Sequence, residues 1–481
     1  MFFQAIKTPG LAHVSYVLGS DGEALVVDPR RDLGVYLDIL QAQGLHLRYV
    51  LQTHRQEDFI VGMAELAHLT GARTVAFKHP ISGYVDVQLG ERARLQLGRL
   101  SLLALHTPGH TPESMSCAVF LDTHPTLAWG VFTGDALLAG ETGRTDLFHP
   151  ERTYENSALL YDALHSEVLP LGDQALVLPA HGPGSVCASQ IADRELTTLG
   201  LERHRNPVFV LGRDEFISHK LRERLPRPPY FSRMEGVNLH GGISLARKQR
   251  TLPMLSPREL QQTAEVLGLI LDTREPEAFA GGHIPGSLNL WMDGLALFSG
   301  WMATPEMPLY LVLPENTDVR QAELSLARVG MDRVEGVLAG GFRAWRASGL
   351  PIEHHATLTP NELHEQADRF QTLDVRTVSE FEEGHIPNAR HAYVGELEEH
   401  LGELGLRQDA PVAVTCSAGP RGGLAASILQ RNGFQGVANL LGGMTAWKKL
   451  DLPVEVGPAP RPSEAQVQEK AQGEEGQLYY E

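Results

Sequence analysis

The sequence predicts an α/β protein of several domains, and three observations support this fold class. The chain has 481 residues, which is more than one hydrophobic core usually serves. Its C-terminal half contains two copies of one domain, in which short apolar runs alternate with helical segments, as in parallel sheets. Its first half combines paired strands with amphipathic helical segments. Apolar residues make up 42% and charged residues 21%, which is ordinary for a soluble globular protein.

The first half of the chain carries signals for both strands and helices. The stretch SYVLGSDGEALVVD at 15–28 predicts two strands joined by an Asp-Gly turn. The segments at 33–44 and 59–71 are amphipathic and each ends at a glycine, as helices often do. Apolar runs at 114–122 and 127–135 predict further strands. Hairpins mixed with strand–helix units favour two mixed sheets with helices on their outer faces.

An internal repeat with a constant offset organises the second half. Asp272 matches Asp374, GGHIPGS matches EGHIPNA, and LAGGFRAW matches LLGGMTAW. Each pair lies 102 residues apart (272 to 374, 283 to 385, 345 to 447). One offset for three motifs indicates two copies of a domain, because a solenoid would repeat about every 20–50 residues.

Four segments follow from these patterns. We expect domains at 1–245, 246–355 and 356–456, with RPPYFSRMEGVNLHGG at 227–242 as a connector. The remaining 457–481 is rich in Pro, Glu, Gln and Gly and is expected to be disordered.

Charge and cysteine content narrow the expected partners and location. The net charge of −18 disfavours nucleic acid and anionic membranes, which need a basic face. Three cysteines do not make a disulfide framework, and the N-terminus MFFQAIKTPG does not read as a signal peptide. No apolar stretch approaches the length of a membrane helix, and the low cysteine content favours a reducing cytoplasm. A homo-oligomer is also expected.

Four polar motifs in the first half each end an apolar run, where strands lead into functional loops. They are THRQED at 53–58, HTPGHTPES at 106–114, FTGDALLAGETGRTDL at 132–147 and PAHGPGS at 179–185. This ordered set resembles the metallo-β-lactamase superfamily. Together with DPRRD at 28–32, it is similar to the persulfide dioxygenases, and the fused repeat resembles persulfide dioxygenase–rhodanese fusion proteins.

The resemblance implies an αββα sandwich with one Fe(II) ion per chain, held by His54, His110 and Asp135. Gln56 and Phe59 stand where a two-metal hydrolase of the superfamily has histidines, so a binuclear zinc site is damaged at both metals. Two histidines and one carboxylate form the facial triad of non-heme iron oxygenases, which leaves positions open for substrate and dioxygen. Zinc remains the alternative metal.

Several neighbours of these ligands have two possible roles. Gln56 is a candidate to hydrogen-bond a metal-bound water. Asp58 and His181 either support the ligands through hydrogen bonds or contact the metal weakly. Arg144 binds a substrate carboxylate or pairs with an acidic residue such as Asp146.

The second repeat carries a nucleophile motif. Cys416–Arg421 reads Cys-x-x-Gly-x-Arg between an apolar strand and a helix, and it resembles the rhodanese active-site loop. A thiolate at a helix N-terminus is stabilised by free N–H groups and the helix dipole, and Arg421 adds a positive charge for a sulfonate group. The loop is one residue shorter than in related phosphatases, which favours sulfur transfer. The expected catalytic residues are Cys416 and Arg421, and the expected substrate-binding residues are Ser417, Ala418, Gly419 and Gly422.

The first repeat lacks this loop. Position 314, which corresponds to Cys416, is Pro314, so this copy is predicted to be catalytically inactive.

The leading functional hypothesis is an iron-dependent persulfide dioxygenase joined to a sulfurtransferase. Its expected partners are a thiol persulfide of the glutathione type, sulfite or thiosulfate, and dioxygen. Two alternatives stay open: a zinc-dependent thioester hydrolase of the glyoxalase II type, and a non-enzymatic sulfur sensor or scaffold with a degenerate metal site.

Overall fold

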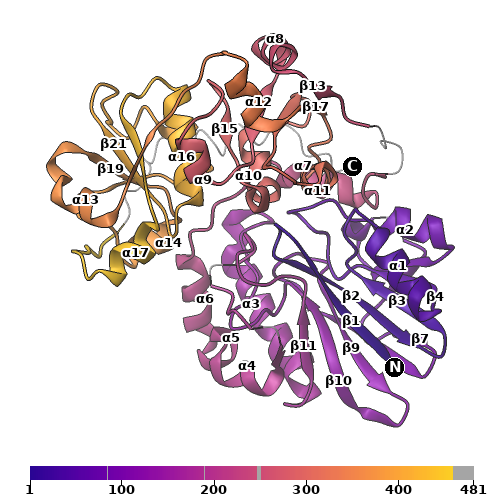
Figure 1. Ribbon diagram of the computed structural model, residues 1–481. Helices are drawn as coiled ribbons and strands as arrows, with labels where there is room; N and C mark the ends of the chain where they lie inside the picture. Colours follow the sequence, from indigo (N-terminus) through magenta and orange to yellow (C-terminus); the bar gives the residue numbers. More distant parts are fainter. Residues whose placement is uncertain (84, 189, 195, 246–250, 459–481) are drawn as a thin grey trace. The chain divides into compact units, whose positions relative to one another are not determined.

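The computed structural model describes residues 1–458, apart from 84, 189, 195 and 246–250 (Figure 1). It has two compact units, Met1–Glu353 and His354–Glu481. The first unit contains the N-terminal sandwich and the first rhodanese-like copy, and the second unit contains the second copy. The tail that we expected to be disordered lies outside the described residues from position 459 onward.

Two six-stranded mixed sheets form the N-terminal sandwich (Figure 1). In spatial order, the first sheet contains β1 (Phe2–Thr8), β2 (His13–Ser20), β3 (Glu23–Val27), β4 (His46–Leu51), β5 (Arg73–Phe77) and β6 (Val87–Leu89). The second contains β12 (Thr197–Thr198), β11 (Leu176–Pro179), β10 (His124–Gly134), β9 (Met115–Leu121), β8 (Leu100–His106) and β7 (Arg94–Leu97). The predicted hairpin is present, because β2 pairs antiparallel with β3 around Asp21 and Gly22, both with positive φ.

The core of the sandwich lies between the two sheets. Leu18 and Leu25 of the first sheet pack with Leu102 and Phe132 of the second in one buried cluster. A second buried cluster lies on the other face of the second sheet. In it, Val131 of the sheet packs with Leu160, Leu199 and Phe216 of the covering helices. The helices are α1 (Gly34–Gln43), α2 (Met63–Thr70), α3 (Thr153–Ala163), α4 (Leu199–Arg205), α5 (Pro207–Val210), α6 (Arg213–Arg222) and α7 (Phe231–Leu239). The αββα expectation is therefore confirmed.

The connector expected at 227–242 is wrong in part, because it contains α7. Phe231 and Met234 of this helix are buried in a cluster with Ile60, which follows the THRQED motif. Prolines and glycines flank the segment and suggested a loop, although the residues between them form a short helix.

The two rhodanese-like copies have the same parallel five-stranded sheet. The first copy contains β13 (Met254–Leu255), α8 (Pro257–Leu267), β14 (Leu269–Asp272), α9 (Pro276–Ala280), β15 (Leu288–Asn289), α10 (Leu295–Met302), β16 (Leu309–Val312), α11 (Val319–Arg328), β17 (Val334–Leu338) and α12 (Gly341–Ala347). The second contains β18 (Ala356–Leu358), α13 (Pro360–Glu365), β19 (Gln371–Asp374), α14 (Val378–Glu382), β20 (Arg390–His391), α15 (Leu397–His400), β21 (Val412–Thr415), α16 (Pro420–Arg431), β22 (Val437–Leu440) and α17 (Gly443–Lys449).

The structure repeats the sequence offset. The sheet orders are β13-β17-β16-β14-β15 and β18-β22-β21-β19-β20, and all neighbours within them are parallel. Trp345 donates its indole N–H to the carbonyl of Pro351, and Trp447 donates in the same way to Pro453. Two copies of one parallel α/β domain are thus confirmed.

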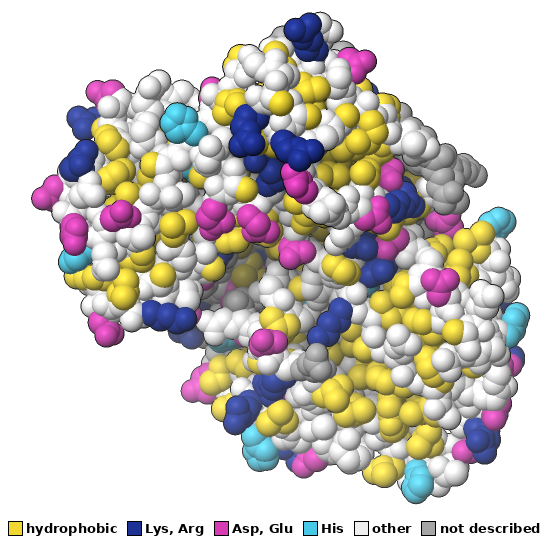
Figure 2. Space-filling model, viewed as in Figure 1, with side chains coloured by type: hydrophobic (Ala, Val, Ile, Leu, Met, Phe, Trp, Pro, Cys, Tyr) yellow, Lys and Arg dark blue, Asp and Glu magenta, His cyan; other side chains and the backbone are white. Residues whose placement is uncertain are grey.

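Two surface properties concern possible partners. On the face drawn in Figure 2, acidic and basic side chains are interspersed rather than separated into large fields. Among the described residues, the structure contains no helix with the length and apolar character needed to cross a membrane.

Candidate functional site

The polar motifs of the first domain meet at one edge of the sandwich. β4 leads into the segment 52–62, which we call the metal loop, and β8 leads into 107–114. Asp135 follows β10, and His181 follows its parallel neighbour β11. The backbone N–H of Met115 donates to the carbonyl of Thr53 at 2.8 Å, which ties the two sheets together at this edge. The carboxyl ends of strands from both sheets therefore bring the motifs together.

His54, His110 and Asp135 are brought into one buried cluster. Nε2 of His110 lies 3.6 Å from Oδ2 of Asp135, and the rings of His54 and His110 have centroids 5.1 Å apart. Glu57 joins them, with Oε1 at 3.2 Å from Nε2 of His110 and Oε2 at 4.0 Å from Nε2 of His54. The side chains of all four residues are at most 1% exposed.

The two histidines present free ring nitrogens to the centre of this cluster. Nδ1 of His54 bonds to the Thr53 hydroxyl at 2.9 Å, and Nδ1 of His110 bonds to the Arg144 carbonyl at 2.8 Å. Nε2 of each histidine is buried without a hydrogen-bond partner among the described residues. Asp28 holds Thr53 by accepting from its N–H and its hydroxyl, at 2.8 and 2.7 Å. Fixed imidazoles whose other nitrogen is free are the usual form of metal-ligating histidines, so these residues fit a metal ion.

The protonation of the cluster reflects burial and its opposed charges. Burial lowers the pKa of His54 to about 4. Burial also lowers the pKa of His110, but the Glu57 and Asp135 carboxylates outweigh it and raise that pKa to about 9. Burial raises the pKa of Glu57, but His110 and His54 outweigh it and lower that pKa to about 2. A divalent cation would take the place of the proton on His110.

His181 lies between two carboxylates. Its Nδ1 is 2.8 and 2.9 Å from the two oxygens of Asp135, and its Nε2 is 3.0 Å from Oδ2 of Asp58. Burial lowers the pKa of His181, but Asp135 and Asp58 outweigh it and raise the pKa well above its ordinary value. In this arrangement His181 and Asp58 orient Asp135 through hydrogen bonds, which is one of the two roles expected for them.

The remaining residues of the metal loop are enclosed. Phe59 is fully buried, with its ring centroid 4.2 Å from that of His13. The side-chain amide atoms of Gln56 are buried without a hydrogen-bond partner among the described residues. Asn238 of α7 donates to the backbone carbonyls of Gln56 and Phe59, both at 2.7 Å, and accepts from the N–H of Val61 at 3.0 Å. Asn238 therefore fixes the path of the metal loop.

Arg144 is paired inside the protein. Its Nε and Nη2 donate to the two oxygens of Asp146 at 2.6 and 2.8 Å, and its Nη1 donates to the carbonyl of Pro226 at 2.9 Å. The side chain is 1% exposed. Of the two roles expected for Arg144, this geometry favours pairing with Asp146, while the backbone carbonyl of Arg144 holds His110.

The Cys416 loop has the predicted strand–loop–helix setting. Cys416 follows β21, and its Sγ accepts from the N–H of Gly419 at 3.0 Å. Ala418 is exposed at the rim of the loop. Gly422 lies in the first turn of α16 under Asn439, and a Cβ there would come within 2.2 Å of the Asn439 amide oxygen. A glycine is therefore required for the helix to start this close to the sheet.

Glu380 of α14 contacts this loop, and the sequence did not predict it as a site residue. Its oxygens accept from Nη1 and Nη2 of Arg421 at 2.8 and 2.7 Å. Ser417 donates its hydroxyl to the same carboxylate at 2.5 Å. The guanidinium expected to receive a sulfonate is thus held by an acidic side chain from the neighbouring helix.

The first rhodanese-like copy has no counterpart of the cysteine, the glutamate and the arginine of this site. At the offset of 102 residues, Pro314, Ala278 and Val319 replace Cys416, Glu380 and Arg421. The Asp272–Arg274 ion pair, at 2.6 Å, is retained in both copies as Asp374–Arg376. A pocket of about 320 Å³ remains at the Pro314 loop. The copy keeps its structural ion pair and lacks a nucleophile in that loop.

Two residues in or near the metal loop, Glu57 and Cys187, were not among the site residues predicted from the sequence. Glu57 occupies a position that the superfamily motif leaves unspecified, so no pattern pointed to it. Cys187 follows the PAHGPGS motif, and its Sγ lies 3.3 Å from Oε1 of Glu57. Burial, followed by the Glu57 and Asp58 charges, raises the pKa of Cys187 well above its ordinary value, so it stays a thiol that donates to Glu57.

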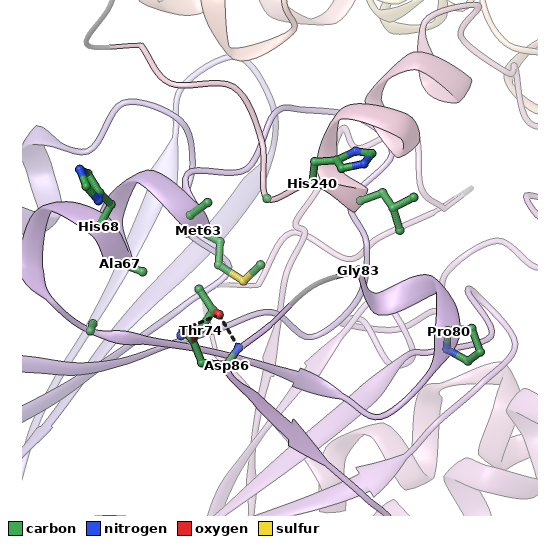
Figure 3. A pocket seen from close by; sticks show the side chains of 12 residues that line it. Met63, Ala67, His68, Thr74, Pro80, Gly83, Asp86 and His240 are labelled. Atoms are coloured by element: carbon green, nitrogen blue, oxygen red, sulfur yellow. Dashed lines mark hydrogen bonds between the residues drawn. The ribbon is translucent and has the colours of Figure 1, made fainter.

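A pocket of about 610 Å³ is lined by α2, by Pro80, Gly83 and Asp86, and by the end of α7 (Figure 3). His68 and His240 are on its walls, and Asp86 accepts from the N–H of Thr74 at 2.8 Å. The ligand candidates of the metal loop do not line this pocket.

Family models match most of the described chain. The metallo-beta-lactamase superfamily matches residues 8–181, and the rhodanese-like domain matches residues 256–348 and 359–450. Among curated relatives, the mitochondrial persulfide dioxygenase ETHE1 of Mus musculus is 28% identical over 236 residues, which span 48% of this chain and 84% of the relative. The hydroxyacylglutathione hydrolase of Methylobacillus flagellatus is 30% identical over 220 residues, which span 44% of this chain and 76% of the relative.

A solved structure extends the likeness beyond the first domain. A metallo-beta-lactamase from Staphylococcus aureus matches with a TM-score of 0.62 and 26% identity, over 70% of this chain and 98% of that chain. The N-terminal domain of the chain therefore belongs to the metallo-β-lactamase superfamily, with persulfide dioxygenases among its homologues, and two rhodanese-like domains follow it.

Proposed function

We propose that the chain is an iron-dependent persulfide dioxygenase joined to a sulfurtransferase. One observation carries the proposal: His54, His110 and Asp135 meet in a buried cluster although Gln56 and Phe59 replace the histidines of a two-metal site. A donor set of two histidines and a carboxylate suits Fe(II) oxygen chemistry and leaves positions for external ligands. The homology to persulfide dioxygenases supports the same reaction class.

The first reaction converts a thiol persulfide, dioxygen and water into the thiol, sulfite and two protons (RSSH + O₂ + H₂O → RSH + SO₃²⁻ + 2H⁺). Iron, when bound, would supply the site for the persulfide sulfur and dioxygen. His54 and His110 are pre-oriented by Thr53 and the Arg144 carbonyl, so little reorganisation is needed to hold the ion. Phe59, which is fully buried, keeps water from the side where a second metal would lie. The proposed thiol is of the glutathione type.

The second reaction moves sulfane sulfur through Cys416. The thiolate attacks the outer sulfur of thiosulfate, the S–S bond breaks, and sulfite leaves with the electron pair; the product is a Cys416 persulfide. The N–H of Gly419, which lies 3.0 Å from Sγ, stabilises the negative sulfur at the start of α16. An acceptor thiol then takes the sulfur, and the reverse direction would consume sulfite made by the first domain.

The test is metal content and oxygen uptake. Protein purified anaerobically and loaded with Fe(II) is expected to bind one iron per chain and to consume dioxygen with glutathione persulfide. His110→Ala is expected to lose both the iron and the uptake. Uptake that is absent in the loaded wild type, or unchanged in His110→Ala, would instead support a sensor or scaffold.

Similarity to the hydroxyacylglutathione hydrolase favours a second candidate, zinc-dependent thioester hydrolysis. The replacement of two histidine positions by Gln56 and Phe59 argues against it. Two zinc ions per chain together with rapid thioester hydrolysis would decide for the hydrolase.

A further inference from the structure

The metal loop contains a carboxylate that the two-histidine, one-aspartate set does not use. Glu57 points into the centre of the cluster, with Oε1 at 3.2 Å from Nε2 of His110 and Oε2 at 4.0 Å from Nε2 of His54. Ligand atoms about 2.1 Å from one metal lie about 3.0 Å apart when adjacent and about 4.2 Å apart when opposite. Both separations fall in this range, as does the 3.6 Å between His110 and Asp135.

The free atoms of the cluster point to a missing cation. Nε2 of His54, Nε2 of His110 and Oε2 of Glu57 are buried without a hydrogen-bond partner among the described residues. Neighbouring groups fix these side chains: Oε1 of Glu57, which also faces His110, accepts from the thiol of Cys187, and each histidine Nδ1 has its own partner. Ligands are commonly fixed in this way by neighbours that leave one atom free for the metal.

Charge leads to the same conclusion. The described ion pairs of Glu57 are with His54 and His110 alone, and the side chain is 1% exposed. A buried carboxylate is costly unless a cation compensates it. Two neutral histidines with Asp135 and Glu57 carry two negative charges, which balance one divalent ion.

We propose that Glu57 is a fourth protein ligand of the metal, so that the site is a two-histidine, two-carboxylate set. This inference rests on the proposed function, because it assumes that His54, His110 and Asp135 hold the ion. The metal loop lacks the second histidine of the superfamily pattern at Gln56 and offers a carboxylate one residue later. A six-coordinate ion held by these four residues would have two positions left for external ligands, which would be enough for one sulfur and one dioxygen.

The experiment measures metal binding, not activity. Fe(II) affinity of the full chain is determined anaerobically by competition with a chromophoric chelator, and Co(II)-loaded protein is compared by its visible absorption spectrum. Glu57→Gln is expected to weaken Fe(II) binding by at least about tenfold, and to change the Co(II) spectrum, because a charged donor is lost. Glu113→Gln is the matched control: Glu113 is buried and its Oε1 accepts from the N–H of Arg55, a role that an amide oxygen can fill.

The outcomes separate this inference from the proposed function. Unchanged Fe(II) affinity and an unchanged Co(II) spectrum in Glu57→Gln, with binding lost in His110→Ala, would overturn only the fourth ligand. Iron retained by His110→Ala would overturn the site itself. Loss of binding in Gln56→Ala but not in Glu57→Gln would assign the fourth position to Gln56. If Glu57→Gln does not fold, Glu57→Asp keeps the charge with a shorter reach; affinity below wild type supports the proposal, and wild-type affinity contradicts it.

Discussion

The guanidinium of Arg328 donates to both carboxylate oxygens of Asp32, at 2.9 and 2.8 Å, across 296 positions of sequence. Asp32 belongs to the DPRRD motif of the first domain, and Arg328 ends α11 of the first rhodanese-like copy. The adjacent Arg31 donates to Asp332 at 2.7 Å, and the N–H of Ile60 donates to the carbonyl of Arg328 at 2.7 Å. Within the first unit, the first rhodanese-like copy therefore supports the metal loop and the DPRRD segment beside it.

Arg328→Ala is expected to lower the free energy of unfolding by about 3 kcal/mol, because it leaves Asp32 largely buried with one cation fewer. Arg30, whose Nε lies 3.0 Å from Asp32, keeps the loss at the lower end of the range for buried pairs. Urea unfolding of the full chain measures the effect. Arg346→Ala, an exposed arginine on α12 of the same copy, is the control and should change little. Equal losses in the two variants would show that the pair does not stabilise the unit.

Asn238→Ala is expected to destabilise the metal loop by about 3 kcal/mol, because three backbone groups lose their buried partner. The lost contacts are those to Gln56, Phe59 and Val61. Because the loop carries His54, we also expect weaker iron retention, measured as iron per chain after gel filtration. His240→Ala, an exposed change just after α7, is the control for disturbance of the helix. Wild-type iron content in Asn238→Ala would mean that the loop holds its path without this side chain.

The two proposed activities should be lost independently. Cys416→Ser is expected to abolish thiosulfate:cyanide sulfur transfer and to keep oxygen uptake with a persulfide, because Cys416, the proposed nucleophile, lies in a separate unit. His110→Ala is expected to show the reverse. Both rates are measured on the same preparations, so each variant controls for the folding of the other. Residual sulfur transfer in Cys416→Ser would show that another thiol is the nucleophile.

Glu380→Gln is expected to lower the KM for thiosulfate by roughly threefold to fivefold, on the order of 1 kcal/mol, because it frees Arg421 from a competing carboxylate. The two hydrogen bonds at 2.7 and 2.8 Å that now occupy the guanidinium would be lost in part. Steady-state kinetics with thiosulfate and cyanide measure KM and kcat separately. Glu383→Gln, an exposed change just after α14, serves as the control. A raised KM would indicate that Glu380 positions Arg421 for the substrate instead of competing with it.

The same carboxylate predicts how stability depends on pH. Burial raises the pKa of Glu380, but hydrogen bonding and charge from Arg421 outweigh it and lower the pKa from 4.5 to about 2. For an acid with a lowered folded-state pKa, the stabilisation is complete above the unfolded pKa and is lost as the pH falls through the folded value. Urea unfolding of wild type and Glu380→Gln should differ by a constant amount between pH 8 and about 5, and by less at pH 3. A difference that grows towards low pH would contradict the assigned sign.

Much of the fold follows from local pattern. The Asp21-Gly22 turn, the apolar runs of the strands and the 102-residue offset indicated the hairpin, the sheets and the duplicated domain, because these signals lie within short stretches. The helix α7 was missed because only two of its apolar residues, Phe231 and Met234, are fully buried, and they pack against Ile60, which lies far away in sequence.

The candidate site was predictable to the extent that motifs specify residues. His54, His110, Asp135, Cys416 and Arg421 stand at motif positions, so their residue types could be recognised from sequence alone. Glu57 and Glu380 could not be recognised in this way, because only their contacts in the folded protein, with His110 and Arg421, mark them as site residues. Glu380 lies 41 positions from Arg421.

By itself, the sequence determined the domain content, the parallel α/β class of the repeat, the absence of a nucleophile at Pro314 and the short set of candidate ligands. These properties depend on residue identity and spacing along the chain. The tertiary structure alone decided that Glu57 faces the two histidines, that His181 lies between Asp135 and Asp58, and that Arg328 reaches Asp32. Such relationships arise when strand ends and helix ends from distant parts of the chain converge. A buried charged side chain is then stable only if folding also brings a partner of opposite charge or a hydrogen-bond partner next to it.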